Sequence, residues 1–552
     1  MGHFSCSQGR YPSVYHFHQG QFMRTTLRIG AAAVAATVAT AGAIAPATAA
    51  ESQGPKNIIY MIGDGMGYGH VAFNNLYETG QSKYLVDGAF SAEGPEELDG
   101  ESVQRFEDFN RLSMTTFPNN SSYDPHKAWA SHEYVDKGYT DSSAAGTAMS
   151  TGVKTDNGKL GINEYGHKLE NTSERAKKAG KSAGVVSSVP FSHATPAAWA
   201  AHNISRNNYL AIADEMFNSD LDVIMGAGHP FYDDDNIKQD EAKYKYASEE
   251  VYNKLSSGAS DWNYVETKEQ FEALAQGNVA AGQKYFGLAP VASTLQQKRS
   301  GESAVPYDIP RNDVVDLSTM TTGALNALGQ NDKGFHVMIE GGAIDWSGHG
   351  NESARDIEEV QDFNKSVDAA IDWVEENSSW DETLLVVTAD HETGYLSGAN
   401  ERAEGKFNSM NGGGNNTLPS GHQWYSTQHT NQVVPFFFKG AGSEAIRAKA
   451  TNTDPVRGDY IDNTTLAKLT LNEWWIKHDD QGGKDQAEDS ASEQPDNNDA
   501  GVGTGEGSST SGLLAGIAGA GIASLTIAAI AFLAQQLGII TINPHAWRNF
   551  FH

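Results

Sequence analysis

The chain has 552 residues, and apolar side chains make up 39% of it, which excludes a wholly disordered protein. Its 70 acidic and 39 basic residues give a formal charge of -31, which argues against a nucleic-acid partner and favours cations or a salty exterior. Cys6 is the only cysteine, so the sequence excludes an intramolecular disulfide and zinc sites built from several thiolates. Any metal must therefore be bound by His, Asp, Glu or hydroxyl side chains.

The N-terminal end has the pattern of an export signal behind an upstream extension. Arg24 and Arg28 form a short positive region, an Ala-rich apolar stretch follows, and Ala47-Thr48-Ala49 provides an A-x-A cleavage motif. A buried Ala-rich helix is the alternative. Because charge, length and cleavage residues agree, we expect residues 1–50 to be an upstream extension and signal peptide, and Cys6 to be removed with them.

The C-terminal end has the pattern of a linker followed by a membrane anchor. Residues 479–511 carry nine acids and a single lysine, so we expect a solvated acidic linker. Residues 513–534 then run for 22 positions without a charge. As a helix this segment would be about 33 Å long, which is enough to span a bilayer. The sequence thus predicts a transmembrane anchor over 512–540 and a short cytoplasmic tail over 541–552, with a buried helix as the alternative.

Between these ends, short apolar runs alternate with helical patterns such as 353–376. Runs rich in Ile and Val indicate four buried strands, at 57–62, 183–188, 335–339 and 383–388. Such alternation is typical of a mostly parallel sheet covered on both faces. We therefore predict one α/β domain over 51–478, with a large, mostly parallel central sheet and helices on both faces. The polar stretches 89–136 and 239–310 are expected to be insertions or a cap.

Acidic residues follow three of the predicted strands. Asp64, Glu340 and the pair Asp390-His391 each come within two residues of the end of an apolar run. In open α/β sheets the ligand crevice lies beyond the carboxyl ends of the strands, so distant parts of the chain would bring these acids together. Taken singly, an aspartate after a strand is more often a turn or a helix cap.

Two further positions add histidines to this set. Asp345 and His349 are four residues apart, one helical turn, so both could bind one ion. Alone, such a pair is more often a surface pair, and His429 alone is more often a solvated loop histidine. The joint occurrence of four carboxylates and three histidines favours metal sites built from oxygen and imidazole ligands.

Ser142 is the candidate nucleophile. The small residues that follow Asp141 predict a helix that begins at this serine, and a helix N-cap is its structural alternative. A helix N-terminus offers free N–H groups and a positive dipole end, which suit a phosphate group. A nearby Zn²⁺ could also promote loss of the hydroxyl proton without a histidine base.

Together these residues resemble the bacterial alkaline phosphatase family, over about residues 57–440. The motifs occur in the family's order: Gly63-Asp64-Gly65-Met66-Gly67, Thr140-Asp141-Ser142 with 150–155, His193-Ala194-Thr195-Pro196 with Ser205-Arg206, Glu340-Gly341 through Asp345 to His349, Thr388-Ala389-Asp390-His391, and Gln428-His429-Thr430. The resemblance implies a phosphomonoesterase in which Ser142 forms a phosphoserine, while Arg206, oriented by Asp141, binds two phosphate oxygens.

The resemblance also implies two zinc ions and a third ion, usually Mg²⁺. The first zinc would be bound by Asp345, His349 and His429. The second would be bound by Asp64, Asp390 and His391, and would activate Ser142. The third ion would be bound by Asp64, Thr195 and Glu340, and His193 would either bind it directly or hold a metal-bound water. His193 and Trp346 stand where some members carry Asp and Lys, so Zn²⁺ or Co²⁺ could replace Mg²⁺ here.

The expected protein acts on small phosphomonoesters, forms a homodimer and is tethered to the outer cell surface for phosphate acquisition. One rival is a sibling that cleaves sulfate esters or phosphodiesters. Sulfatases need a C/S-x-P-x-R setting, which is missing after Ser142, and diesterase relatives commonly use Thr and lack an arginine like Arg206. Another rival is an inactive surface-binding homologue, which the intact ligand set argues against.

Overall fold

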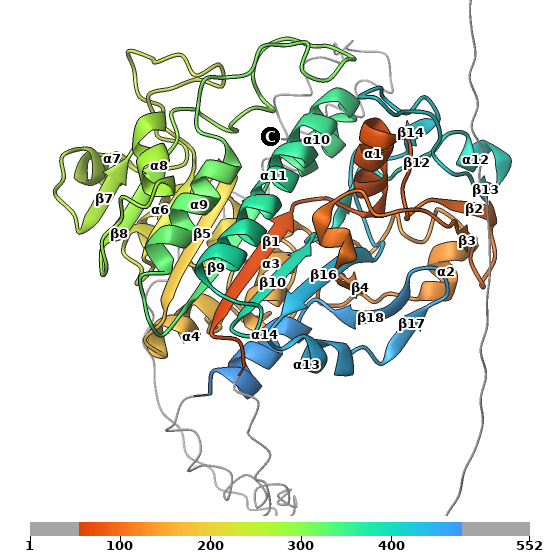
Figure 1. Cartoon of the computed structure of the whole chain (residues 1–552), viewed down its shortest axis with the longest axis horizontal. Coiled ribbons are helices and arrows are strands. Elements are labelled where there is room, and N and C mark those ends of the chain that lie inside the picture. The colour runs from red at the N-terminus through yellow and green to blue at the C-terminus, as the bar shows by residue number, and fades with distance from the viewer. Residues whose placement is uncertain (1–53, 477–552) are drawn as a thin grey trace, which may run out of the picture. The chain divides into compact units, whose positions relative to one another are not determined.

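The computed structural model describes residues 54–476, and an 11-stranded sheet runs through its centre (Figure 1). From one edge to the other its strands are β17 (Asn452–Asp454), β18 (Gly458–Asp462), β4 (Asn110–Thr115), β16 (Val434–Gly440), β10 (Thr383–Thr388), β1 (Asn57–Gly63), β9 (Phe335–Gly341), β5 (Ser182–Pro190), β6 (Val223–Ala227), β8 (Lys284–Leu288) and β7 (Trp262–Val265). The pairs from β10 to β7 are all parallel. β16 pairs antiparallel with both β10 and β4.

The central strands form because their apolar runs are buried on both faces. Every residue of β1, β5, β9 and β10 is buried, as expected for parallel strands between two layers of helices. These strands coincide with the four predicted runs. The prediction of a large, mostly parallel sheet is therefore confirmed.

Helices cover both faces of the sheet. Figure 1 shows α8, α9 and α11 in front of it and α3 and α14 behind it. In chain order the helices are α1 (Tyr68–Thr79), α2 (Pro125–Ala130), α3 (Ser142–Thr151), α4 (Thr172–Lys178), α5 (Ala194–Ala197), α6 (Tyr209–Phe217), α7 (Glu249–Ser256), α8 (Lys268–Ala275), α9 (Leu317–Leu328), α10 (Ala343–Gly350), α11 (Ser353–Asn377), α12 (Glu401–Glu404), α13 (Ser443–Ala448) and α14 (Thr465–Leu469). One 3-10 turn spans Arg105–Asp108, and a π-helical turn, Thr470–Trp474, extends α14.

The long helix α11 illustrates why these segments are helical. Its buried apolar residues recur every three or four positions and form one stripe along the helix, made of Ile357, Val360, Phe363, Val367, Ile371 and Val374. The helix packs against β1, β9 and α9. The predicted helix at 353–376 is confirmed.

Two polar stretches differ from the expectation of insertions or a cap. The stretch 89–136 contains β4, and 239–310 contains β7 and β8, all strands of the central sheet. These strands have only four to six residues each and are surrounded by polar sequence, so their apolar content is diluted in any longer window. Backbone pairing with a neighbouring strand, rather than a hydrophobic run, defines them.

Three small sheets lie outside the central one within the described residues 54–476. They are β11 (Glu392–Thr393) with β15 (His429–Thr430), β12 (Leu396–Gly398) with β14 (His422–Trp424), and β13 (Lys406–Phe407) with β2 (Val86–Ala89) and β3 (Glu96–Glu97). The first of them carries His429 to the candidate site.

The predicted signal peptide, acidic linker, membrane anchor and cytoplasmic tail all lie outside the described residues, as does Cys6. Within residues 54–476, no helix combines the length and apolar character needed to cross a membrane.

Candidate active site

Neighbouring parallel strands bring the predicted acids together at their carboxyl ends. β1 lies between β9 and β10, and Ile62 is in register with both Glu340 and Thr388. The residues that follow these strands therefore emerge side by side, as the sequence predicted. Asp64, Glu340 and Asp390 are fully buried there.

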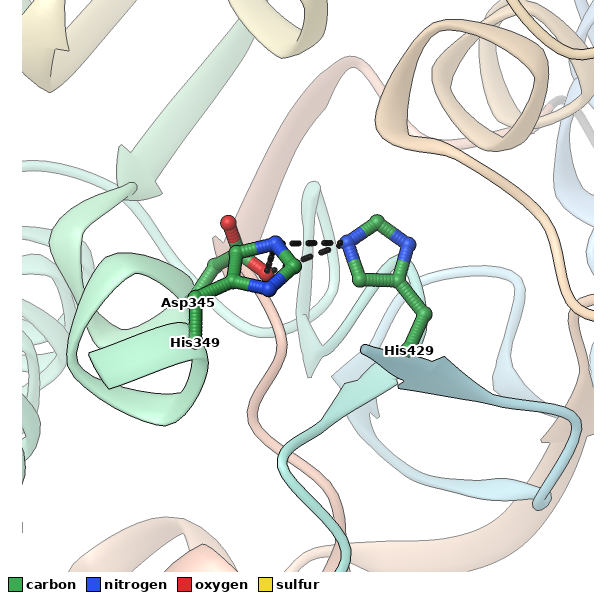
Figure 2. A group of neighbouring side chains, drawn as sticks. All are labelled: Asp345, His349 and His429. Atoms are coloured by element: carbon green, nitrogen blue, oxygen red, sulfur yellow. Dashed lines mark hydrogen bonds and ion pairs between the residues drawn. The ribbon is translucent and has the colours of Figure 1, made fainter. Parts of the chain in front are cut away.

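One group of possible metal ligands joins α10 to β15. Figure 2 shows Asp345 and His349, from α10, facing His429 from β15. The Asp345 Oδ1 atom lies 3.4 Å from His349 Nε2 and 3.3 Å from His429 Nε2, and the two Nε2 atoms are 3.2 Å apart. We call these three residues the open cluster, because the His349 side chain is 37% exposed. One carboxylate and two imidazoles, each able to supply one atom, make a donor set suited to zinc.

Backbone carbonyls fix the orientation of both imidazoles in the open cluster. His349 Nδ1 lies 2.7 Å from the Thr427 carbonyl oxygen, and His429 Nδ1 lies 2.7 Å from that of Thr140. A carbonyl oxygen can only accept, so each Nδ1 donates its proton, and in the neutral form that binds a metal each Nε2 offers its lone pair to the ion. Sequence reasoning missed these two partners, because any residue type provides a carbonyl.

A second group, which we call the sealed cluster, consists of Asp64, Asp390 and His391, each 0% exposed. His391 Nε2 lies 3.2 Å from Asp390 Oδ2 and 3.5 Å from Asp64 Oδ1. The other Asp390 oxygen accepts from the backbone N–H of Gly65 at 3.2 Å and of His391 at 3.0 Å. Gly65 adopts φ +76°, and a Cβ there would lie 2.9 Å from the Asp345 Cα, so only glycine fits this turn.

Crowded, buried carboxylates dominate the electrostatics of the site. Burial, together with the charges of Asp390 and Asp345, raises the pKa of Asp64 well above its usual range. Burial and neighbouring carboxylates raise the pKa of Asp390 to about 6 and that of Glu340 to about 7. One oxygen of each of these three carboxylates is buried without a hydrogen-bond partner. Buried charges of this kind are stable only when paired or bound to a metal, so the site fits divalent cations.

Asp345 behaves differently because histidines surround it. Burial alone would raise its pKa, but His349 and His429 outweigh that effect and hold it well below the usual range. The same carboxylate raises the pKa of His429 in spite of the burial of that ring. The open cluster thus carries internal charge compensation that the sealed cluster lacks.

The residues predicted for a third ion lie beside the sealed cluster. Thr195 Oγ1 donates to Asp64 Oδ2 at 3.4 Å, and Glu340 interacts with the side chains of both Thr195 and Asp64. Ser187 donates a short hydrogen bond to Glu340. His193 is the N-cap residue of α5, its Nδ1 has no hydrogen-bond partner, and burial lowers its pKa to about 3.

Ser142 lies at the junction between the sealed cluster and a helix N-terminus. Asp141, not Ser142, is the N-cap of α3: its side chain accepts from the Ala144 N–H at 3.0 Å. The capping alternative for Ser142 is therefore wrong, and its hydroxyl is free for other contacts. Ser142 Oγ lies 3.2 Å from His391 Nε2, and Arg206 Nη1 donates to Asp141 Oδ2 at 3.0 Å.

Thr393 connects the two clusters and was not predicted from the sequence. Its hydroxyl donates to Asp345 Oδ1 at 2.5 Å and lies 3.2 Å from His391 Nδ1. The rings of His391 and His429 stack with centroids 3.6 Å apart. The two clusters are therefore immediate neighbours. The spacing Asp390-His391-x-Thr393, with strand β11 directly after β10, was the available signal.

Comparisons with known proteins agree with this geometry. The family model described as alkaline phosphatase matches residues 55–433, so the chain belongs to the alkaline phosphatase family. "Alkaline phosphatase 4" of Bacillus subtilis (strain 168) is 31% identical over 358 residues, which cover 62% of this chain and 63% of that protein. The chain thus matches a little under two thirds of the length of this curated relative.

Solved structures share the fold. Alkaline phosphatase from the Antarctic bacterium TAB5 is 23% identical, with a TM-score of 0.52, 77% of this chain and 100% of that chain covered. A histidine-to-aspartate mutant of the TAB5 enzyme, solved with Mg bound, is 22% identical and has a TM-score of 0.53, with 77% and 99% covered. At these identities the likeness establishes the fold.

Proposed function

We propose that the protein is an alkaline phosphatase that hydrolyses phosphomonoesters through a phosphoserine on Ser142. The observation that carries this proposal is the position of the Ser142 hydroxyl at the start of α3, 3.2 Å from His391 of the sealed cluster, next to the Arg206–Asp141 pair. A nucleophile, a phosphate-binding cation and two groups of metal ligands thus converge at one edge of the sheet. A tethered protein that had lost its activity would not need this arrangement.

The ligand sets suit two zinc ions and one magnesium ion. The open and sealed clusters offer mixed nitrogen and oxygen donors, and Asp64, Thr195 and Glu340 offer oxygen alone, which suits Mg²⁺. When bound, such ions supply the positive charge that lowers the pKa of a coordinated hydroxyl and stabilises the entering and leaving oxygens. The Mg-bound TAB5 mutant supports a magnesium ion in this fold.

The chain's own residues account for substrate placement and for the bonds that change. Arg206 presents a planar fork to two phosphate oxygens, and its hydrogen bond to Asp141 holds it in place. The Ser142 Oγ loses its proton and forms a bond to phosphorus, while the bond from phosphorus to the leaving oxygen breaks. Water then cleaves the phosphoserine, releasing inorganic phosphate and restoring the serine hydroxyl.

Replacing the nucleophile tests the proposal directly. Ser142→Ala should abolish phosphoserine formation and lower turnover of a chromogenic phosphomonoester by roughly three or more orders of magnitude. Ser150→Ala, at the other end of α3, is the matched control, since Ser150 bonds the Ala198 carbonyl away from the clusters. Wild-type phosphate transfer to an alcohol acceptor by Ser142→Ala would exclude this serine as the nucleophile.

Substituting Arg206 tests whether the enzyme is a monoesterase rather than the rival diesterase or sulfatase. A monoester dianion exposes more charged oxygens to the guanidinium than a diester does. Arg206→Ala should therefore weaken monoester turnover and phosphate inhibition by about 1–3 kcal/mol, the range for charge-assisted hydrogen bonds. Parallel assays with a phosphomonoester, a diester and a sulfate ester decide the class, and unchanged inhibition by phosphate would contradict this role.

We further propose that the enzyme is exported, homodimeric and tethered outside the cell by its C-terminal segment, where it acquires phosphate. The export motif, the acidic linker and the uncharged 513–534 stretch support the tether. All proposed ligands lie between Asp64 and His429, so a chain ended before Asp479 should be soluble and fully active. A truncated enzyme that stays in the membrane fraction, or is secreted but inactive, would contradict the tether.

A further inference from the structure

A continuous row of rings lies beside the phosphate-binding Arg206. The ring centroids of Trp346 and His193 are 5.6 Å apart, and His193 stacks against Tyr209 at 6.1 Å. Tyr209 contacts Tyr246 edge to face at 5.1 Å. Trp346 directly follows the open-cluster ligand Asp345, and the charge of Arg206 acts on both His193 and Tyr209. One side of the row therefore borders the place where the transferred phosphate is proposed to bind.

An exposed lysine stands at each end of this row. Lys298 Nζ lies 5.4 Å from the ring centroid of Trp346, and Lys245 Nζ lies 4.7 Å from that of Tyr246. These distances are typical of cation–π contacts, which place an ammonium group without neutralising it. Neither lysine has a carboxylate within ion-pair distance anywhere in residues 54–476. Both positive charges are thus available to an anion, in a chain whose formal charge is -31.

The backbone beneath Lys298 is firmly anchored. Its two neighbours are buried: Gln297 donates to Glu352 at 2.7 Å, and Arg299 donates to Glu358 at 2.7 Å. Arg299 also donates to the carbonyls of residues 309 and 310. Among residues 297–299, only Lys298 is exposed, so its side chain reaches solvent from a fixed backbone and ligand binding does not have to order a flexible loop.

The two lysines lie on loops that follow neighbouring parallel strands. Segments 228–248 and 289–316 leave the carboxyl ends of β6 and β8, which pair in parallel. Asp234 joins them, because its side chain accepts from the Ser293 N–H at 2.8 Å and its carbonyl accepts from Asn312 at 2.8 Å. The Asp234 carboxylate acts electrostatically on both lysines, but its hydrogen bond to Ser293 keeps it in the loop junction.

We propose that Lys245, Lys298 and the ring row between them form a leaving-group subsite that binds a second phosphate of the substrate. The subsite rests on the proposed function, since it selects among phosphomonoesters. Its preferred substrates are small esters whose leaving group carries another phosphate, the two phosphates being separated by a spacer that lies against Trp346 or Tyr209. The two ammonium groups then balance a charge that the acidic surface elsewhere repels.

The test compares matched esters on the metal-loaded enzyme. The probes are the bisphosphates of straight-chain diols with two to six carbons, each paired with the alkyl monophosphate of equal length. We expect kcat/KM to favour the bisphosphate by roughly five- to tenfold, from two exposed charge-assisted contacts, with an optimum spacer length. Lys298→Gln and Lys245→Gln should each reduce this preference, and the double variant should remove it. Raising ionic strength should reduce the preference of the wild type but not that of the double variant.

Lys333→Gln is the matched control, since this exposed lysine precedes β9 and lies at the amino ends of the strands, away from the site at their carboxyl ends. It removes the same charge and should leave the preference at the wild-type value. A wild-type enzyme without a bisphosphate preference, or an equal loss in Lys333→Gln, would overturn the subsite while leaving the phosphatase assignment intact. A wild type that cleaves none of the phosphomonoesters would overturn the proposed function and the subsite with it.

Discussion

The open and the sealed cluster use similar ligands in contrasting surroundings. Asp345, His349 and His429 combine one carboxylate with two imidazoles, and His349 reaches solvent. Asp64, Asp390 and His391 combine two carboxylates with one imidazole and are completely buried. Before any ion binds, the first group is partly neutralised by its own histidines, whereas the second concentrates negative charge in the interior.

Ions bound in the two clusters would therefore contribute differently. An ion in the open cluster can exchange with solvent and keep a position for water or the leaving group. An ion in the sealed cluster would neutralise buried carboxylates and lie next to the Ser142 hydroxyl. It would therefore contribute both to the stability of the fold and to the reaction. Removing one equivalent ligand from each cluster tests this difference.

The largest expected difference is between His391→Ala and His349→Ala. Each variant loses one imidazole, and each should lower the affinity for one zinc by roughly 100-fold or more, beyond the 10–100-fold typical of outer-shell changes. His391→Ala should lose more activity, because this ring also contacts Ser142, the proposed nucleophile. Zinc content by elemental analysis and kcat on a chromogenic ester measure both effects.

Excess zinc provides the control for this pair. Added Zn²⁺ should restore His349→Ala substantially, since solvent can supply the missing ligand at an exposed position. The same addition should restore His391→Ala little, because its site is closed to water. Equal rescue of the two variants would mean that burial does not distinguish the clusters.

A second prediction concerns pH and the metal-free protein. The pKa values of Asp390, at about 6, and Glu340, at about 7, lie above those of unfolded carboxyls, so these groups hold protons more tightly in the folded state. Their contribution to stability is therefore present at acidic pH and is lost as pH rises to about 7. Tm of chelator-treated protein should fall by roughly a few degrees between pH 5 and 8, relative to the metal-loaded form.

Glu340→Gln is the matched variant for this measurement. The amide has no proton to lose in that range, so part of the pH dependence of metal-free Tm should disappear. Metal-loaded wild type should show a much flatter profile, since bound cations favour ionised carboxylates. A metal-free wild type whose Tm is unchanged or rises over this range would contradict the charge crowding in the sealed cluster.

The contrast between the clusters also marks what the sequence could predict. Asp64 and Asp390 were predictable because each follows an apolar run, and parallel pairing forces such positions together. The carbonyl partners of His349 and His429 were not, because the hydrogen bonds depend on where Thr427 and Thr140 place their backbone. Strands β4, β7 and β8 were not predicted for a related reason, since pairing with a neighbouring strand rather than composition defines them.

The smallest expected effect concerns the third ion, which would share Asp64 with the sealed cluster. His193 lies near this group, but its contacts in the structure are with the rings of Trp346 and Tyr209, so we expect it to act on the ion indirectly. A carboxylate in its place would add a hard oxygen ligand and a negative charge, both of which favour Mg²⁺ over softer ions. His193→Asp should therefore strengthen activation by Mg²⁺ by a few-fold, and weaken activation by Co²⁺ relative to Mg²⁺. Titrating each ion into metal-stripped wild type and variant, with both zinc sites filled, measures this shift. Identical activation curves for the two proteins would show that His193 does not influence the third site.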